Sequence, residues 1–526
     1  MKKYKILIML LFTIATFSCQ DELDTNPTDS TSGDILFADV EKAKVALNGI
    51  YRAMYVADEW SANWADEEFG TMAFLLSYNL MGEDMVQNEE GSGWFYFDYR
   101  YNVKSDYTNK SGRPYSVWFF HYTLISNVNA IIAAKDEMAG APSEINSLIG
   151  QAYALRAYSY FNLIRLYQQT YKGNENAPGV PIYTEPTTNA SEGKPRGTVS
   201  EVYTRINEDI EEAISLLNPD NAAPRTHPSH IDYYVANGFK ANIALEKNDW
   251  ATAEAAAKIA LSGGTSMLSK ANLNNGFAFN DVNANTVLWG VQIISEQISG
   301  TQSFFGHMDA ATENYAETAR KCISTWLYNQ MSETDVRKNK WWLGPLENDA
   351  EIGPEFSYNQ FKFQFSDPTN NLGDYIFMRH EEMMLVEAEA MCMQGKFSEA
   401  RAILEELMAE RDENYDISTK TNANTLTTTD ANGPTTPATG SVTLLDEIIL
   451  QRRIELWGEV SRIFDIKRLK TGFTRDFEGS NHVDKLLTRN TLNPEYPDFV
   501  MSIPQSEFDG NSNMDETTDQ NPFANN

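Results

Sequence analysis

The chain has 526 residues, of which 42% are hydrophobic and 12% aromatic, so it can bury a large core, and its length allows about three domains. Its formal net charge is -32 at pH 7. A field of that sign repels phosphate backbones, which argues against nucleic acid as a partner and leaves neutral ligands open.

Residues 1–18 have the pattern of a secretory signal peptide. Three lysines lie within the first five residues, and the apolar run that follows is too short to span a bilayer, which takes a helix of ~20 residues. Cys19 comes directly after this run and directly before the acidic stretch QDELD. This order predicts a bacterial lipoprotein signal, in which the Cys19 thiol is acylated and several acyl chains hold the protein on a membrane. Thr16 stands where such signals usually carry an aliphatic residue, so ordinary cleavage that leaves a free thiol is the alternative.

Residues 19–39 are polar, acidic and interrupted by proline and glycine, which predicts a flexible, lipidated tether. No other stretch approaches 18 consecutive apolar residues, so we expect nothing else to cross a membrane. Cys322 and Cys392 alone make no disulfide framework.

Helical periodicity begins after the tether and is most regular in two segments that are similar to one another. These segments are KANIALEKNDWATAEAAAKIA and EAEAMCMQGKFSEARAILEEL. A small residue where two helices cross, a turn former, an aromatic side chain and then an alanine are typical of a tetratricopeptide (TPR) helix pair. The matching positions are Ala241 and Ala388, Asn248 and Gly395, Trp250 and Phe397, and Ala253 and Ala400.

Each such pair leaves an apolar face uncovered, so several pairs must stack. We predict a mainly α fold in which TPR-like helix pairs form a scaffold, interrupted by irregular loops and short strands. A low-complexity loop at 412–441 is too polar to build a core. The predicted pairs are 40–54 with 115–138, 143–217, 230–262 and 374–411, and the insertions cover about 56–112 and 268–372.

Five stretches, in order along the chain, resemble the SusD/RagB family of outer-membrane lipoproteins. Any one of them is a weak signal, but the ordered set is specific, and it covers almost the whole chain. The stretches are QAYALRAYSYFNLIRLY, NTVLWGVQ, DYIFMRHEEMMLVEAEAM, LLDEIILQRRIELWGEVSRIFDIKRL and FVMSIPQSEFDGNSN with the later QNP.

The resemblance implies one SusD-like domain over residues 40–526, with TPR-like pairs as scaffold and a ligand site on the insertions. It also implies a role at the cell exterior, where the lipid-anchored protein captures a glycan and covers a SusC-like TonB-dependent outer-membrane transporter. Acidic residues after the lipidated cysteine are typical of surface-exported lipoproteins in this family. On that interpretation QDELD is a signal for export to the cell surface, and the alternative is that it only keeps the tether soluble.

Charged residues in the periodic helices are expected to be structural rather than catalytic, because charges in such helices are usually paired or solvated at the helix edge. The terminal helix motif can form ion pairs at a spacing of three residues, such as Arg452 with Glu455 and Arg462 with Asp465. The other charges interpreted in this way are Arg156, Arg379, Glu387 and Glu389.

Glycan binding is expected from aromatic side chains on the irregular segments. A sugar ring stacks its apolar C–H face on an aromatic ring, while polar side chains bind its hydroxyls. The alternation in WFYFDYRY predicts a strand-like stretch, with Trp94, Tyr96 and Asp98 on one face. The predicted glycan-binding residues are Trp94, Tyr96 and Tyr315, followed by Trp60, Asn88 and Phe305.

Signatures of catalysis are absent from the sequence, which has no P-loop, no G-x-S-x-G and no cysteine pair with metal spacing. We therefore expect a binding protein that is not an enzyme and needs no cofactor or metal. Two alternatives stay open. The same scaffold can present a groove to a peptide or protein, and the 74 acidic residues leave room for the paired carboxylates of a helical surface glycoside hydrolase.

Overall fold

The computed structural model describes residues 36–57, 65–108, 110, 112–188, 190–298, 300–312, 314–348, 353–427, 429–430, 433–434 and 442–523. The predicted signal peptide, the predicted lipidation site Cys19, the candidate Trp60 and most of the expected tether lie outside these residues. Within them, no helix is both long enough and apolar enough to cross a bilayer.

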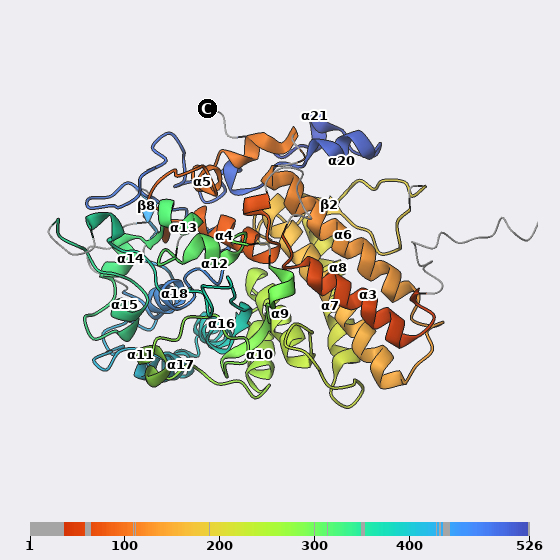
Figure 1. Cartoon of the computed structure of the whole chain (residues 1–526), viewed down its shortest axis with the longest axis horizontal. Coiled ribbons are helices and arrows are strands. Elements are labelled where there is room, and N and C mark those ends of the chain that lie inside the picture. Colours follow the sequence, from red (N-terminus) through yellow and green to blue (C-terminus); the bar gives the residue numbers. More distant parts are fainter. Residues whose placement is uncertain are drawn as a thin grey trace, which may run out of the picture.

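A continuous stack of helices forms the scaffold, which confirms the mainly α fold class (Figure 1). Each helix from α6 to α10 packs on the next, α10 packs on α16, and α16 packs on α17 and α18, while α3 contacts both α6 and α7. The insertion between α10 and α16 therefore interrupts the sequence but not the stack. The helices are α3 (Val40–Ala53), α6 (Arg113–Ala133), α7 (Pro142–Tyr167), α8 (Val199–Leu217), α9 (Tyr233–Glu246), α10 (Trp250–Leu261), α16 (His380–Met393), α17 (Phe397–Ala409), α18 (Leu444–Glu455) and α19 (Arg462–Leu469).

The turns of the two similar helix pairs have the same backbone conformation. Asn248, between α9 and α10, has φ 61°, and Gly395, between α16 and α17, has φ 77°. Both lie in the left-handed region, which favours glycine and tolerates asparagine. The four alanines matched between the two segments have no exposed surface, as close helix crossings require: Ala241, Ala253, Ala388 and Ala400.

Replacing Gly395 with alanine should lower the free energy of unfolding by about 1 kcal/mol, because an L-residue with a Cβ is strained in the left-handed region. A Cβ at this position would have no atom within 4 Å, so the cost comes from the backbone alone. Asn248→Gly is the matched control, and we expect it to change stability by less than about 0.5 kcal/mol. Denaturant unfolding measures both. A Gly395→Ala variant with the same free energy of unfolding as the native chain would contradict the prediction.

The remaining elements are short, and most belong to the insertions and the C-terminal region. In Figure 1, α13, α14 and α15 lie at the left of the helix stack, whereas α20 and α21 lie at its top. The short α-helices are α4 (Thr71–Leu80), α5 (Tyr96–Tyr99), α11 (Lys270–Asn274), α12 (Phe304–Met308), α13 (Tyr315–Thr318), α14 (Thr325–Asn329), α15 (Val336–Lys340), α20 (Gln505–Gly510) and α21 (Glu516–Asp519). The 3-10 turns are η1 (Ala65–Glu67), η2 (Val103–Thr108), η3 (Ser295–Gln297), η4 (Pro354–Phe356) and η5 (Pro497–Phe499).

All strands of the described residues pair as antiparallel, two-stranded ribbons. The ribbon β4–β6 joins the insertion to the start of α16, and β1–β5 joins the two insertions to each other. The pairs are β1 (Met85–Gln87) with β5 (Lys321–Ile323), β2 (Pro178–Pro181) with β3 (Arg196–Thr198), β4 (Val287–Val291) with β6 (Tyr375–Arg379), and β7 (Thr429–Asp430) with β8 (Gly433–Pro434).

The terminal helix motif does form an ion pair at a spacing of three residues, between Asp465 and Arg468 at 2.7 Å, but the two pairs named from the sequence are wrong. Arg452 binds Asp465 on α19 at 2.9 Å, and Arg462 binds Glu83 at 2.9 Å, so both arginines find partners on other elements. Glu455 is approached by arginines from three other parts of the chain. The interpretation of the helical charges as paired scaffold residues is confirmed: Arg156 binds Asp209, Arg379 binds Glu455, Glu387 approaches Lys258, and Glu389 binds Arg468.

Candidate functional site

The ribbon β1–β5 brings together two segments that lie more than two hundred residues apart in the sequence. Gln87 is paired with Lys321 and Met85 with Ile323. The loop that leaves β1 carries Trp94, and the helix that enters β5, α13, begins at Tyr315. The two aromatic residues that the sequence predicted on separate insertions therefore meet at one end of this ribbon.

An aromatic cluster forms where these segments meet. The rings of Trp94 and Tyr315 lie 4.4 Å apart between centroids at an interplanar angle of 67°. Tyr315 also stacks on His307 at 4.4 Å and 11°. His307 is buried, whereas Trp94 and Tyr315 remain half-exposed. The cluster thus offers two accessible rings, at a steep angle to one another, on a rigid base.

Asp66 gives this cluster a polar edge. Its carboxylate accepts hydrogen bonds from the Tyr315 hydroxyl at 2.6 Å and from the Gln302 amide at 3.2 Å. Its backbone carbonyl lies 2.6 Å from His307 Nε2. Burial, together with the charge of Lys321, lowers the pKa of His307 well below its usual range, so the imidazole is neutral and donates its Nε2 hydrogen to that carbonyl.

A buried arginine fixes the two elements that carry the site. Arg113, at the start of α6, binds Glu67 and Glu68 at 3.1 Å each and Asp98 at 3.2 Å. Glu67 ends η1, which holds Asp66, and Asp98 lies in α5, directly after Trp94. Burial raises the pKa of Glu67 to about 8 and that of Glu68 to about 7, against the opposing effect of the Arg113 charge. Arg113 therefore ties both elements to the scaffold helix.

The expected strand over WFYFDYRY is wrong. Phe95 has φ 58°, in the left-handed region, and the chain then forms the single helical turn α5 from Tyr96 to Tyr99. An extended strand cannot pass through such a residue. The preceding loop is held from the ribbon by Gln87, whose side-chain amide donates to the carbonyls of Glu89 and Trp94 at 3.1 and 3.0 Å.

The other predicted binding residues differ in position. Tyr96 is half-exposed on α5, where its ring contacts Tyr99 and the Arg100 guanidinium. Asn88 follows β1 directly, and its side-chain carbonyl is buried without a hydrogen-bond partner among the described residues. Both lie on the segment that carries Trp94, so they stay candidates for the border of the site.

Phe305 is a wrong prediction. It is 1% exposed and packs against the rings of Phe365 and Tyr375, so it belongs to the core and has no free face for a sugar. Ser303 caps the short helix α12 and directs Phe305 inward. A Gly/Ser/Thr-rich sequence indicated a loop correctly but did not indicate which of its aromatic side chains would be buried.

Two residues of the cluster were missed from the sequence. Asp66 lies among several acids, and His307 follows two phenylalanines in a segment chosen for its aromatic residues. Composition gave no reason to select either one. Among the residues that the structure describes, no group of three or more His, Cys, Asp or Glu side chains is arranged to hold a metal ion.

The pH dependence of stability should reveal the buried Lys321 beside this cluster. Burial lowers the pKa of its ammonium to about 7 from the ordinary 10.5. Between these values the unfolded chain binds one more proton than the folded chain, so stability rises with pH across this window. The buried charge therefore destabilises the fold most at pH 7 and below.

We expect Lys321→Met to increase the free energy of unfolding, relative to the native chain, more at pH 7 than at pH 10. Urea titrations at the two pH values measure this difference. Lys485→Met, at an exposed lysine paired with Asp476, is the control. Its change in the free energy of unfolding, relative to the native chain, should be the same at pH 7 and at pH 10. A Lys321→Met effect that does not change with pH would mean that the lysine keeps its ordinary pKa in the folded chain.

Comparisons with known proteins match nearly the whole chain. The family model described as "Starch-binding associating with outer membrane" matches residues 62–237, and the model described as "SusD family" matches residues 239–523. The SusD-like protein P2 of Formosa agariphila is 24% identical, over 98% of this chain and 99% of its own length.

Solved structures share the fold. A SusD-like carbohydrate binding protein from Bacteroides vulgatus superposes with a TM-score of 0.76 at 24% identity, covering 93% of this chain and 99% of its own. A surface glycan-binding protein A from Bacteroides uniformis gives a TM-score of 0.63 at 17% identity, covering 91% and 99%. At these identities the likeness establishes the architecture of the scaffold and its insertions.

Proposed function

The chain belongs to the SusD family, and from this premise we propose that it captures an oligosaccharide at the cell surface and delivers it to a partner TonB-dependent outer-membrane transporter. Family membership supports a glycan-binding role in nutrient uptake in general. The observation that carries the proposal for this chain is the half-exposed pair of Trp94 and Tyr315, with the Asp66 carboxylate at its edge.

The geometry suits a sugar because it combines both kinds of contact that a pyranose needs. An aromatic face covers the apolar C–H surface of the ring, and a carboxylate accepts hydrogen bonds from hydroxyls at its edge. Two rings set at 67° support two successive or branched residues rather than one flat chain. The site is preformed, since Arg113 and the ribbon fix its elements, so little ordering is needed on binding.

We further propose that binding is not followed by chemistry, and that acyl chains on Cys19 hold the protein at the outer membrane, facing the cell exterior. A lipid anchor leaves the folded domain free to cover the transporter, which then supplies the energy for uptake. The polar, acidic stretch after Cys19 is long enough to act as the tether.

Isothermal titration calorimetry on the soluble form that begins at Gln20 tests the binding function. Maltoheptaose is the first probe, because the family description that matches residues 62–237 names starch. Other neutral oligosaccharides, acidic oligosaccharides and a few peptides complete the panel. Saturable heat with one glycan supports the proposal. Heat that continues steadily after each injection indicates turnover and favours the hydrolase. Saturable heat with a peptide, together with no binding heat for any sugar, favours the peptide-binding lid.

Replacing Cys19 with serine should release the full-length protein from the membrane, because serine lacks the thiol that would be acylated. Labelling with radioactive palmitate and membrane fractionation measure this directly. We expect the native chain in the outer-membrane fraction and Cys19→Ser without label. Label and membrane association that persist in Cys19→Ser would exclude Cys19 as the anchor.

A further inference from the structure

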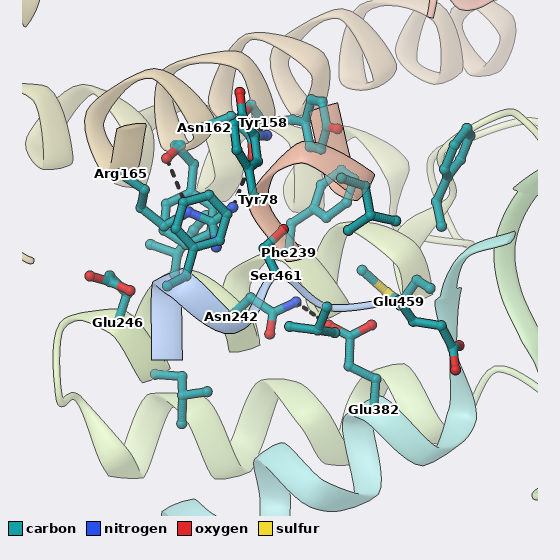
Figure 2. A pocket seen from close by; sticks show the side chains of 18 of the residues that line it. Tyr78, Tyr158, Asn162, Arg165, Phe239, Asn242, Glu246, Glu382, Glu459 and Ser461 are labelled. Carbon is teal, nitrogen blue, oxygen red and sulfur yellow. Dashed lines mark hydrogen bonds between the residues drawn. The ribbon is translucent and has the colours of Figure 1, made fainter. Parts of the chain in front are cut away.

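A cavity of about 150 Å³ lies inside the scaffold, away from the aromatic cluster described above. Figure 2 shows α7 on one side of it and α9 and α16 on the other, with the segment before α19 closing the space between them. No residue of the Trp94–Tyr315 cluster lines it. The cavity therefore forms a second site whose properties can be argued separately.

Aromatic rings make up much of its wall. They come from six elements, four helices and two strands, so the space is a junction between elements rather than a groove along one of them. Such a wall suits the apolar face of a small organic molecule better than water alone. The aromatic lining residues are Phe74, Phe161, Phe239, Trp289, Phe377 and Phe464.

One face of α7 supplies a polar strip to the cavity. Tyr158, Asn162 and Arg165 are spaced by four and three residues, so they share one side of the helix. All three line the cavity, and each side chain is partly exposed (Figure 2). The Asn162 side chain accepts a hydrogen bond from Arg165 Nη2 at 2.9 Å. This bond fixes the direction of the guanidinium.

Among the residues that the structure describes, Arg165 forms no ion pair within 4.0 Å. Its guanidinium lies between the rings of Phe161 and Phe464, 3.8 and 3.9 Å from their centroids. Burial lowers its pKa, and the charge of Glu246 acts in the opposite direction. Its Nε donates to the Phe161 carbonyl at 3.3 Å, which leaves N–H groups of the terminal nitrogens for a ligand in the cavity.

Two carboxylates line the same cavity from α9 and α16. Glu246 accepts from the Thr170 hydroxyl at 2.7 Å, and Glu382 accepts from the Asn242 amide at 2.8 Å. The other two acids of the wall are held by arginine or lysine partners: Asp465 by Arg452 and Arg468, and Glu459 by Lys362 and Arg379.

A hydroxyl group without a partner also lies in this wall. Tyr78 is 3% exposed and its hydroxyl makes no hydrogen bond to any described residue. It comes from α4, on a different side of the cavity from α9 and α16 (Figure 2). This hydroxyl adds a polar atom to a largely aromatic wall.

This arrangement selects against simple ions. The wall carries guanidinium groups from Arg165, Arg452 and Arg468 as well as the carboxylates of Glu246 and Glu382, so a small ion of either sign would meet like charge. A hydroxyl group both donates and accepts, so it can satisfy either kind of partner. In the measure by which one water needs about 10–15 Å³, the cavity has room for roughly ten water molecules, so a molecule of the size of one sugar unit can enter it.

We propose that the cavity is an interior binding site for one neutral, monosaccharide-sized polyol, held by the Arg165 guanidinium, the carboxylates of Glu246 and Glu382, and the surrounding aromatic rings. It differs from the surface site in location, in residues and in the size of its ligand. The surface cluster recognises residues of an oligosaccharide, whereas the cavity has room for a single sugar unit.

The test uses thermal unfolding of the soluble chain that begins at Gln20, with D-glucose, D-galactose and D-xylose as probes. A ligand that binds only the folded state raises the midpoint in a saturable way. Sucrose, which is too large for the cavity, is the control for the general stabilising effect of sugars, which does not saturate. Acetate probes the anion alternative.

We expect a saturable rise with at least one monosaccharide in the native chain. Arg165→Met and Asn242→Leu should each weaken the apparent affinity for that sugar by about tenfold or more, since each removes a polar group from the wall. In Trp94→Ala, the monosaccharide should raise the unfolding midpoint as much as in the native chain. This result separates the cavity from the surface site. Using two variants from different helices keeps the test valid if one of them does not fold.

Two results would overturn the proposal. If all three monosaccharides raise the midpoint only as sucrose does, in the native chain and in both variants alike, the cavity holds water alone. If acetate gives the saturable rise and the sugars do not, the site binds an anion. Neither result bears on oligosaccharide binding at Trp94 and Tyr315, which calorimetry measures separately.

Discussion

Replacing Glu455 with glutamine should lower the free energy of unfolding by about 3–5 kcal/mol, because it removes the carboxylate on which three buried arginines converge. Arg337, Arg379 and Arg411 approach this carboxylate at 3.0, 3.4 and 2.9 Å. None of the four side chains has more than 1% of its surface exposed. Burial alone would raise the pKa of Glu455, but the arginines hold it well below the usual range.

The size of the effect follows from where the arginines come from. Arg337 lies in α15, Arg379 ends β6, and Arg411 follows α17, so Glu455 on α18 joins an insertion to the helix stack. Glutamine preserves the volume and one acceptor but leaves three cations with less compensation in a buried site. Guanidinium or urea unfolding at pH 7 measures the loss.

Asp476→Asn provides the matched control, because it makes the same chemical change at an exposed ion pair with Lys485. We expect it to lower the free energy of unfolding by less than about 1 kcal/mol. The pH dependence gives a second check. A depressed carboxyl pKa stabilises the fold above its unfolded value of about 4.5, and this contribution is lost as pH falls below that value. The gap between Glu455→Gln and the native chain should therefore narrow in acid. A gap of less than about 1 kcal/mol at pH 7 would contradict the assignment.

The helix pairs were predictable because their signals are local. A small residue, a turn former and an aromatic residue at fixed spacing identify a helix crossing and its turn, and the left-handed Asn248 and Gly395 match that pattern. The ion pair between Asp465 and Arg468 follows from spacing, but pairs between different elements were not predictable, because spacing reveals only partners on the same helix. Arg462 instead binds Glu83, which lies 379 residues away in the sequence. Only the packing of the stack decides that pairing.

The candidate site was predictable in its aromatic residues and not in its geometry. Composition selected Trp94 and Tyr315 on separate insertions, but their contact depends on the ribbon β1–β5, which has three residues in each strand and no strong sequence pattern. Alternation predicted a strand at Phe95, where a left-handed residue starts a helical turn instead. Phe305 was predicted to bind glycan and is buried against Phe365 and Tyr375, whereas His307, which was not predicted, stacks on Tyr315. The neighbours of each residue, rather than its type, decide this difference.

Replacing Trp94 or Tyr315 with alanine should weaken the binding of the captured glycan by about thirtyfold or more, equivalent to about 2 kcal/mol. Each substitution removes one accessible face of the cluster, and each ring also supports the other, at 4.4 Å. The two losses should not add, because the rings are in contact. Calorimetry with the glycan identified from the panel measures the dissociation constants, and circular dichroism verifies that the variants fold.

Two further variants separate stacking from hydrogen bonding and from general surface effects. Tyr315→Phe keeps the ring and removes only the hydroxyl that donates to Asp66, so it should cost roughly three- to tenfold. Phe119→Ala removes a ring that is 41% exposed on α6, outside the cluster, and should leave the affinity unchanged. If Trp94→Ala and Tyr315→Ala fold normally and bind as tightly as Phe119→Ala, the glycan is held elsewhere on the protein, and the cluster has a structural role only.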